Sequence, residues 1–187
     1  PMLVATALEG HGKVHAEIMK QRPFLQVLVG LQRDGFHPES IGGKVYLRSD
    51  GTPGLDYAVS GYVWDGIRDA FIAMSEIQFA SGAKAVAPVH RDAELYHSLD
   101  KVKKAIASLP MAILKARLFS AHVMGGCPMG ENAAKSVVNS KGRHHEVDNL
   151  SIFDGSVFPT SIAANPMESI FAVTAKFATE LAKVLVM

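Results

Sequence analysis

Three blocks in the last third of this chain decide its fold: Ser120-Ala121-His122-Val123-Met124-Gly125-Gly126-Cys127-Pro128-Met129-Gly130, then Asn149-Leu150-Ser151-Ile152-Phe153-Asp154-Gly155-Ser156-Val157-Phe158-Pro159, and finally Ala164-Asn165-Pro166-Met167. They set two uncharged hydrogen-bonding side chains, His122 and Asn165, on turns, with an Asp-Gly-Ser turn between them. Glycine permits backbone conformations and close approaches that other residues do not. The pattern therefore suits a bound redox cofactor.

The third block begins the last helix that we predict. Asn is a common helix cap, and Pro166 brings the fixed φ that fits a first helical position. From there to about Leu185, seven mostly apolar residues lie on one side of the helix. They are Ile170, Phe171, Thr174, Phe177, Ala178, Leu181 and Leu185. From local sequence alone, capping is the expected role of Asn165, and a side chain that caps a helix is not expected to be fully available for anything else.

The first two thirds predict a mixture of helices and strands. The segment 24–31 is rich in β-branched and aromatic residues, which is typical of a strand. Segments 44–48 and 55–59 alternate apolar and polar residues around a turn at 49–54, which predicts a β-hairpin. Helical periodicity predicts helices over 64–80, closed by Ser81 and Gly82, and over 99–109, stopped by Pro110. A shorter strand is expected at 83–89 and another at 150–153, just before Asp154.

Composition excludes several classes of protein. With 19 Lys plus Arg against 18 Asp plus Glu, the formal charge is +1, so electrostatics imply neither a nucleic-acid partner nor an anionic membrane. No stretch approaches the ~18 apolar residues that span a bilayer, so we expect no integral membrane segment. The single cysteine, Cys127, excludes an internal disulfide and fits a reducing compartment, which favours the cytoplasm. At 187 residues the chain is long enough for one domain or two small ones.

The three blocks, in this order and spacing, resemble the C-terminal part of the glucose-methanol-choline (GMC) family of FAD-dependent alcohol oxidoreductases. The form His122-x-x-Gly125-Gly126-Cys127-x-x-Gly130 is most similar to the cholesterol oxidase branch. The clear similarity runs from about His122 to Leu181, and a weaker one reaches back to 42–57. Two features depart from the usual pattern: Asn139 stands where Asp is common, and His144 and Glu146 precede the Asn149-Leu150 strand.

The resemblance implies catalytic roles for His122 and Asn165. In this family the matching His is the base that takes the hydroxyl proton as hydride moves to the flavin, and the matching Asn lies opposite it across the substrate oxygen. A lone His is more often a core residue bonded to a backbone carbonyl, and only the surrounding motif reverses that preference.

The resemblance also implies contacts to FAD. The pair matching Asp154 and Gly155 contacts the ribitol and pyrophosphate through main-chain groups. The helix start at Pro166 and Met167 lies near the flavin ring, where the helix dipole and the Met167 N–H group would favour negative charge on the reduced ring. A capped helix with solvated N–H groups is the alternative and needs no cofactor.

Three other reactive side chains are weaker candidates for catalysis or metal binding. Cys127 is expected to be a packing residue rather than a nucleophile, because only His122 is near enough in sequence to activate it. His144 and His145 are adjacent and have no further ligand at metal spacing, so we expect no metal site.

The expected architecture is α+β. A mostly antiparallel sheet backed by helices would form a partial substrate-binding domain over residues 1–119. Residues 120–187 would form the C-terminal segment, with a strand and a helix that belong to the FAD-binding domain. No Gly-x-Gly-x-x-Gly motif occurs, so the N-terminal dinucleotide-binding half would come from other sequence. The expected partners are that half and a small-molecule alcohol; the alternative is a non-catalytic or degenerate module that binds an apolar small molecule or a partner protein.

Overall fold

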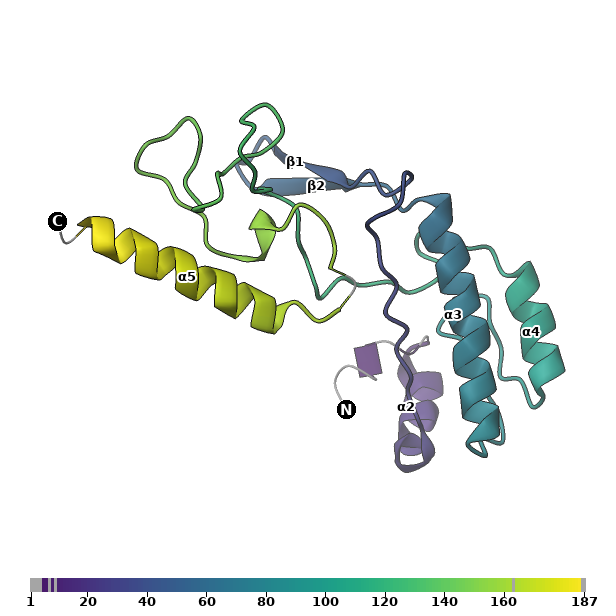
Figure 1. Ribbon diagram of the computed structural model, residues 1–187. Coiled ribbons are helices and arrows are strands. Elements are labelled where there is room, and N and C mark those ends of the chain that lie inside the picture. The colour runs from purple at the N-terminus through teal and green to yellow at the C-terminus, as the bar shows by residue number, and fades with distance from the viewer. Residues whose placement is uncertain (1–4, 7, 9, 163, 186–187) are drawn as a thin grey trace. The chain divides into compact units, whose positions relative to one another are not determined.

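The computed structural model describes residues 5, 6, 8, 10–162 and 164–185 and has α+β architecture, which confirms the predicted class (Figure 1). Its helices are α2 (Gly12–Lys20), α3 (Gly61–Ala80), α4 (Leu99–Ser108) and α5 (Met167–Leu185). Two short 3-10 helices are η1 (Arg22–Phe24) and η2 (Gly155–Val157). The strands β1 (Gly43–Leu47) and β2 (Pro53–Tyr57) form a two-stranded antiparallel sheet.

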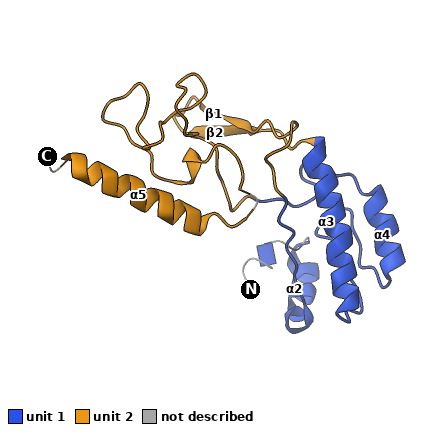
Figure 2. Cartoon of the chain, viewed as in Figure 1, with its two compact units in different colours: residues 1–32, 61–119 blue, residues 33–60, 120–187 orange. Residues whose placement is uncertain are grey.

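The chain divides into two compact units that alternate along the sequence (Figure 2). Unit 1 comprises residues 1–32 and 61–119, and unit 2 comprises residues 33–60 and 120–187. The hairpin thus belongs to the same unit as the C-terminal segment. The division into 1–119 and 120–187, which describes the domains of a larger enzyme, stays a prediction.

Unit 1 is built on the packing of α3 against α4. Each helix buries one stripe at helical spacing, with Ile67 and Phe71 on α3 and Val102 and Ile106 on α4. Ser98 caps α4, because its side chain accepts a hydrogen bond from the Lys101 N–H group at 3.4 Å. Both helices therefore form as predicted, and apolar burial holds them together.

The strand predicted over residues 24–31 is wrong. Phe24 ends η1, and residues 25–31 run without strand pairing. They lie instead beside α3: the Gln78 side chain donates to the Gln26 carbonyl at 3.1 Å, and a Cβ on Gly30 would lie 3.0 Å from Ala70 Cβ. β-Branched composition favours an extended backbone, but a strand also needs a partner with free N–H and C=O groups, and a helix offers none. The strand expected over 83–89 is likewise reduced to one bridge, between Val86 and Tyr96.

The hairpin forms as predicted, with Val45 opposite Leu55 and Lys44 opposite Asp56. Because side chains alternate along a strand, this register gathers Val45, Leu47 and Leu55 on one face. All three are strongly exposed, at 65%, 77% and 75% of their surface. The hairpin therefore presents an apolar face to solvent.

Unit 2 has a small core beneath α5. Val138, Val157 and Phe177 are buried together, and Ile152, Phe153 and other apolar side chains pack around them. The strand expected over 150–153 is represented by a bridge at Ser151, opposite Arg143. The Phe153 carbonyl instead accepts a hydrogen bond from the Thr174 hydroxyl of α5 at 2.7 Å. The segment that leads to Asp154 is thus fastened to the last helix.

Candidate active site

Asn165 uses both ends of its carboxamide. Its Oδ1 accepts a hydrogen bond from the Met167 N–H group at 3.0 Å, which caps α5. Its Nδ2 lies 3.2 Å from Nε2 of His122. The structure therefore brings His122 and Asn165 together across 43 residues of sequence. The expectation that capping would take up the side chain is wrong, because the cap needs only the oxygen.

These contacts fix the orientation of both side chains. The Met167 backbone N–H group can only donate, so the carboxamide atom facing it is the oxygen, and the NH2 group is left to face His122. The NH2 group can also only donate, so Nε2 of His122 accepts, and the ring proton of the neutral imidazole is on Nδ1. The lone pair at Nε2 is consequently directed toward Asn165.

The surroundings of His122 are partly open to solvent. His122 is half-buried, Asn165 is exposed, and Val123 exposes 70% of its surface. Gly125 has a φ of +88°, in the left-handed region that favours glycine. A Cβ on Gly126 would meet nothing closer than Ser156 Cβ at 3.8 Å, so space remains beside this turn.

The Asp154-Gly155-Ser156 turn separates the His122 loop from α5. The Asp154 carboxylate accepts a hydrogen bond from the Ser156 N–H group at 2.8 Å and so caps η2. The loop that follows His122 is bonded to this turn, because Cys127 N–H donates to the Ser156 carbonyl at 2.9 Å and Met129 N–H to the Val157 carbonyl at 2.8 Å. Asp154 and Gly155 thus lie between the two segments that carry His122 and Asn165.

The first turn of α5 carries the free N–H groups that a helix start is expected to have. The Met167 N–H group is engaged with Asn165, and Ile170 N–H donates to the carbonyl of buried Pro166 at 2.8 Å. The N–H groups of Glu168 and Ser169 have no acceptor among the described residues. The sequence predicts such donors at the start of this helix, because first-turn N–H groups lack a partner within the helix, but it named only the Met167 N–H group.

His144 and His145 serve the loops on which they lie. His144 Nδ1 accepts from the Glu146 N–H group at 3.0 Å, and His145 Nε2 lies 3.0 Å from the Gly130 carbonyl oxygen. Close by, Ser140 holds the pKa of Glu131 below its ordinary value, first through its side chain and then through its N–H group, which donates to the Glu131 carboxylate at 3.2 Å. Within the described part of the chain, no three His, Cys, Asp or Glu side chains are grouped so as to hold a metal ion.

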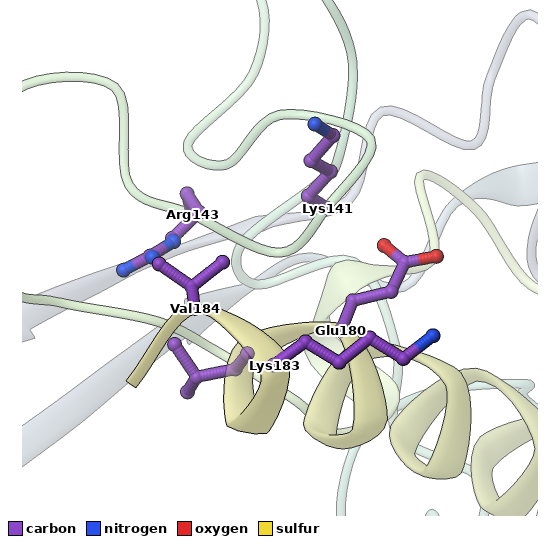
Figure 3. A pocket seen from close by; sticks show the side chains of 6 residues that line it. Lys141, Arg143, Glu180, Lys183 and Val184 are labelled. Carbon is purple, nitrogen blue, oxygen red and sulfur yellow. The ribbon is translucent and has the colours of Figure 1, made fainter. Parts of the chain in front are cut away.

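A separate open hollow of about 460 Å3 lies at the other end of α5 (Figure 3). Its lining is Lys141, Arg143, Glu180, Leu181, Lys183 and Val184. Lys141 and Arg143 point away from one another in Figure 3, so their charges do not converge on one point. In this hollow, Lys141 and Arg143 therefore offer no convergent pair of cationic groups.

Comparison with known proteins identifies the family. A family model described as GMC oxidoreductase matches residues 38–174, well over half of the chain. The chain belongs to the GMC oxidoreductases and corresponds to their C-terminal part. Members of this family are generally flavin-dependent.

Curated relatives agree with this assignment. The chain is 27% identical to an uncharacterised GMC-type oxidoreductase of Sinorhizobium fredii over 75% of its own length and 28% of the relative's. It is 26% identical to a long-chain-alcohol oxidase of Arabidopsis thaliana over 64% of its length and 17% of the relative's. It is 32% identical to a cholesterol oxidase of Acinetobacter baumannii over 40% of its length and 14% of the relative's. The chain thus spans less than a third of each of these proteins.

No helix among residues 5, 6, 8, 10–162 and 164–185 combines the length and the apolar content needed to cross a membrane.

Proposed function

We propose that this chain is the catalytic C-terminal portion of an FAD-dependent oxidoreductase that oxidises an alcohol CH–OH group, with His122 as the base and Asn165 as the residue that orients the alcohol. The observation that carries the proposal is the 3.2 Å contact between His122 Nε2 and Asn165 Nδ2. Nε2 of His122 accepts a hydrogen bond and Nδ2 of Asn165 donates one. An alcohol hydroxyl both donates and accepts a hydrogen bond, so it can pair with both atoms.

The alcohol oxygen fits above the pair. At hydrogen-bond distances of about 2.8 to 2.9 Å from both nitrogen atoms, it would complete a nearly equilateral triangle with them. In that position its O–H group donates to Nε2 of His122 and its lone pair accepts from Nδ2 of Asn165. His122 then takes the hydroxyl proton as the C–H bond gives up hydride, while Asn165 holds the oxygen in place.

The residues around the pair suit the redox-active ring of a flavin. FAD bound here would supply the hydride acceptor. The N–H groups of Glu168 and Ser169 have no acceptor among the described residues and lie at the positive end of α5. They could therefore donate hydrogen bonds to the negative charge of a reduced flavin. Asp154, Gly155, Pro166 and Met167 are proposed to contact the cofactor as well. The Met167 N–H group already donates to the Asn165 cap, so a hydrogen bond from this group to the cofactor would compete with the cap.

The relatives suggest the substrate class. Two of them are named as oxidases of long-chain alcohols and of cholesterol. We propose an apolar alcohol for this chain too, presented by an enzyme that includes an N-terminal FAD-binding half.

The proposal predicts the effect of removing the base. In the enzyme reconstituted from this chain and its FAD-binding half, His122→Ala is expected to slow flavin reduction by ~10²-fold or more, because the hydroxyl proton loses its acceptor. The bleaching of flavin absorbance after mixing with alcohol in a stopped-flow instrument measures this rate, and the flavin content of the purified variant provides the control.

Two results would decide against the proposal. Normal reduction kinetics in His122→Ala would remove His122 from the mechanism. Bound FAD that no alcohol bleaches in the unchanged enzyme would favour a non-catalytic module that binds an apolar molecule or a partner protein.

A further inference from the structure

Gly155 lies between the two segments that carry His122 and Asn165. A Cβ atom on Gly155 would lie 3.0 Å from Ile170 Cδ1, on α5, and 3.1 Å from the carbonyl oxygen of Val123, the residue after His122. Real Cβ atoms rarely approach other atoms so closely. The φ of Gly155 lies outside the left-handed region, so the backbone conformation itself does not require glycine there. The requirement comes from the contacts on either side.

Ile170 and Val123, the two residues that a Cβ on Gly155 would meet, lie close in sequence to Asn165 and His122. Ile170 is tied to the start of α5, since its N–H group donates to the Pro166 carbonyl at 2.8 Å, and Pro166 follows Asn165. Val123 follows His122, and the loop beyond it is bonded to Ser156 and Val157. A side chain at residue 155 would therefore push against both segments at once.

The turn itself is held firmly. The Asp154 carboxylate caps η2, and Val157 is fully buried in the core of unit 2. The segment before the turn is fixed to α5 by the bond from Thr174 to the Phe153 carbonyl. Because the turn cannot easily retreat, an added methyl group at Gly155 must displace its neighbours.

We infer that Gly155 is a positioning residue that sets the separation of His122 and Asn165, in addition to any contact its main chain makes with a cofactor. The Asp154–Val157 turn acts as a spacer of fixed thickness between the His122 loop and α5. This inference rests on the proposed function, because it assigns Gly155 a role for the pair through which the alcohol would react.

The first test concerns the chain without cofactor. In the wild-type chain, titration of His122 should move the NMR signals of the Asn165 side-chain NH2 group, since the two side chains are in hydrogen-bond contact. In Gly155→Ala this coupling should be lost or strongly reduced. The combination of Gly155→Ala with Ile170→Val removes the Cδ1 atom that the new methyl group meets, and should restore it.

The second test uses the reconstituted enzyme. Gly155→Ala is expected to slow flavin reduction by about tenfold with its FAD content maintained, since small misplacements of catalytic groups are costly in rate. The added Ile170→Val should recover most of the loss. Ile170→Val alone is the matched control and should leave the coupling in place.

The outcomes separate this inference from the proposed function. If the coupling persists unchanged in Gly155→Ala, Gly155 is not a spacer, whatever the enzyme does. If the variant loses FAD while the coupling persists, the role of Gly155 lies in cofactor contact and the inference is overturned. If the coupling is lost and Ile170→Val restores none of it, crowding against Ile170 does not set the separation, and the inference is overturned as well. Loss and recovery of the coupling in a chain that oxidises no alcohol would support the spacer and reject the enzymatic proposal.

Discussion

The carboxamide of Asn165 joins a structural role to the chemical one proposed for it. Its oxygen accepts a hydrogen bond from the Met167 N–H group at the start of α5, and its NH2 group faces His122. The helix cap thus holds the amide in the orientation that the proposed chemistry needs. Two substitutions can separate the two functions. Asn165→Asp retains the oxygen that accepts from Met167 N–H, and Asn165→Leu removes both this oxygen and the NH2 group.

Asn165→Asp should preserve stability and impair turnover. A carboxylate still accepts from Met167 N–H and caps a helix well, so the free energy of unfolding should change by less than about 0.5 kcal/mol. It has no N–H group to offer an alcohol, and its charge favours the protonated imidazole, so flavin reduction should slow markedly. Chemical denaturation of the chain and stopped-flow reduction of the reconstituted enzyme measure the two effects.

Asn165→Leu provides the comparison. It should lose about 1 kcal/mol of stability together with activity, because both the cap and the donor disappear. Equal activity in Asn165→Asp and the unchanged enzyme would leave the cap as the only role of this residue.

Among the elements, the packing of α5 depends on Gly142, a glycine in a loop that contacts the aromatic rings beneath the helix. Gly142 has a φ of +72°, and a Cβ there would lie 2.7 Å from the rings of both Phe153 and Phe177. Gly42 has the same φ of +72° but nothing within 4 Å of its would-be Cβ. The two glycines therefore separate the cost of backbone conformation from the cost of crowding.

Gly142→Ala should destabilise the chain by about 1 to 3 kcal/mol more than Gly42→Ala, because only the former also overpacks the core under α5. Gly42→Ala should show the conformational cost alone, on the order of 1 to 2 kcal/mol. Chemical denaturation of both variants measures the difference. Equal losses would mean that the aromatic pair moves aside without cost.

Sequence predicted the elements whose determinants are local. The helices at 61–80, 99–108 and 167–185 carry their own apolar periodicity and end signals, and the hairpin carries a turn with Asp50 and Gly51. The segment 24–31 was mispredicted because composition cannot say which neighbour an extended segment will have. At the candidate site, the sequence motifs selected His122 and Asn165, which lie in contact, and their catalytic roles stay a prediction. The shared use of the carboxamide and the crowding at Gly155 depend on three-dimensional contacts between distant segments.

At the scale of the whole molecule, the described residues leave large apolar side chains exposed. They include Val45, Leu47 and Leu55 on the hairpin and Phe171 on α5, each at least 64% exposed. Extensive exposed apolar surface marks sites of interaction. It agrees with a chain that spans less than a third of the relatives it resembles.

The isolated chain is therefore expected to bind a hydrophobic dye such as anilinonaphthalene sulfonate and to bind FAD weakly. Adding the FAD-binding half should lower the dye fluorescence and yield a yellow complex on size-exclusion chromatography. An unrelated protein at the same concentration is the control. Dye binding that the FAD-binding half leaves unchanged would show that these surfaces have another partner.

The residue that follows Asn165 has a consequence for the lifetime of the site. Exposed asparagines age when the next backbone nitrogen attacks the side-chain amide, closing a five-membered imide that hydrolyses to aspartate. Pro166 supplies a ring nitrogen without a hydrogen, so this cyclisation cannot proceed. The same Asn-Pro step that begins α5 thus shields the NH2 group facing His122 from spontaneous deamidation.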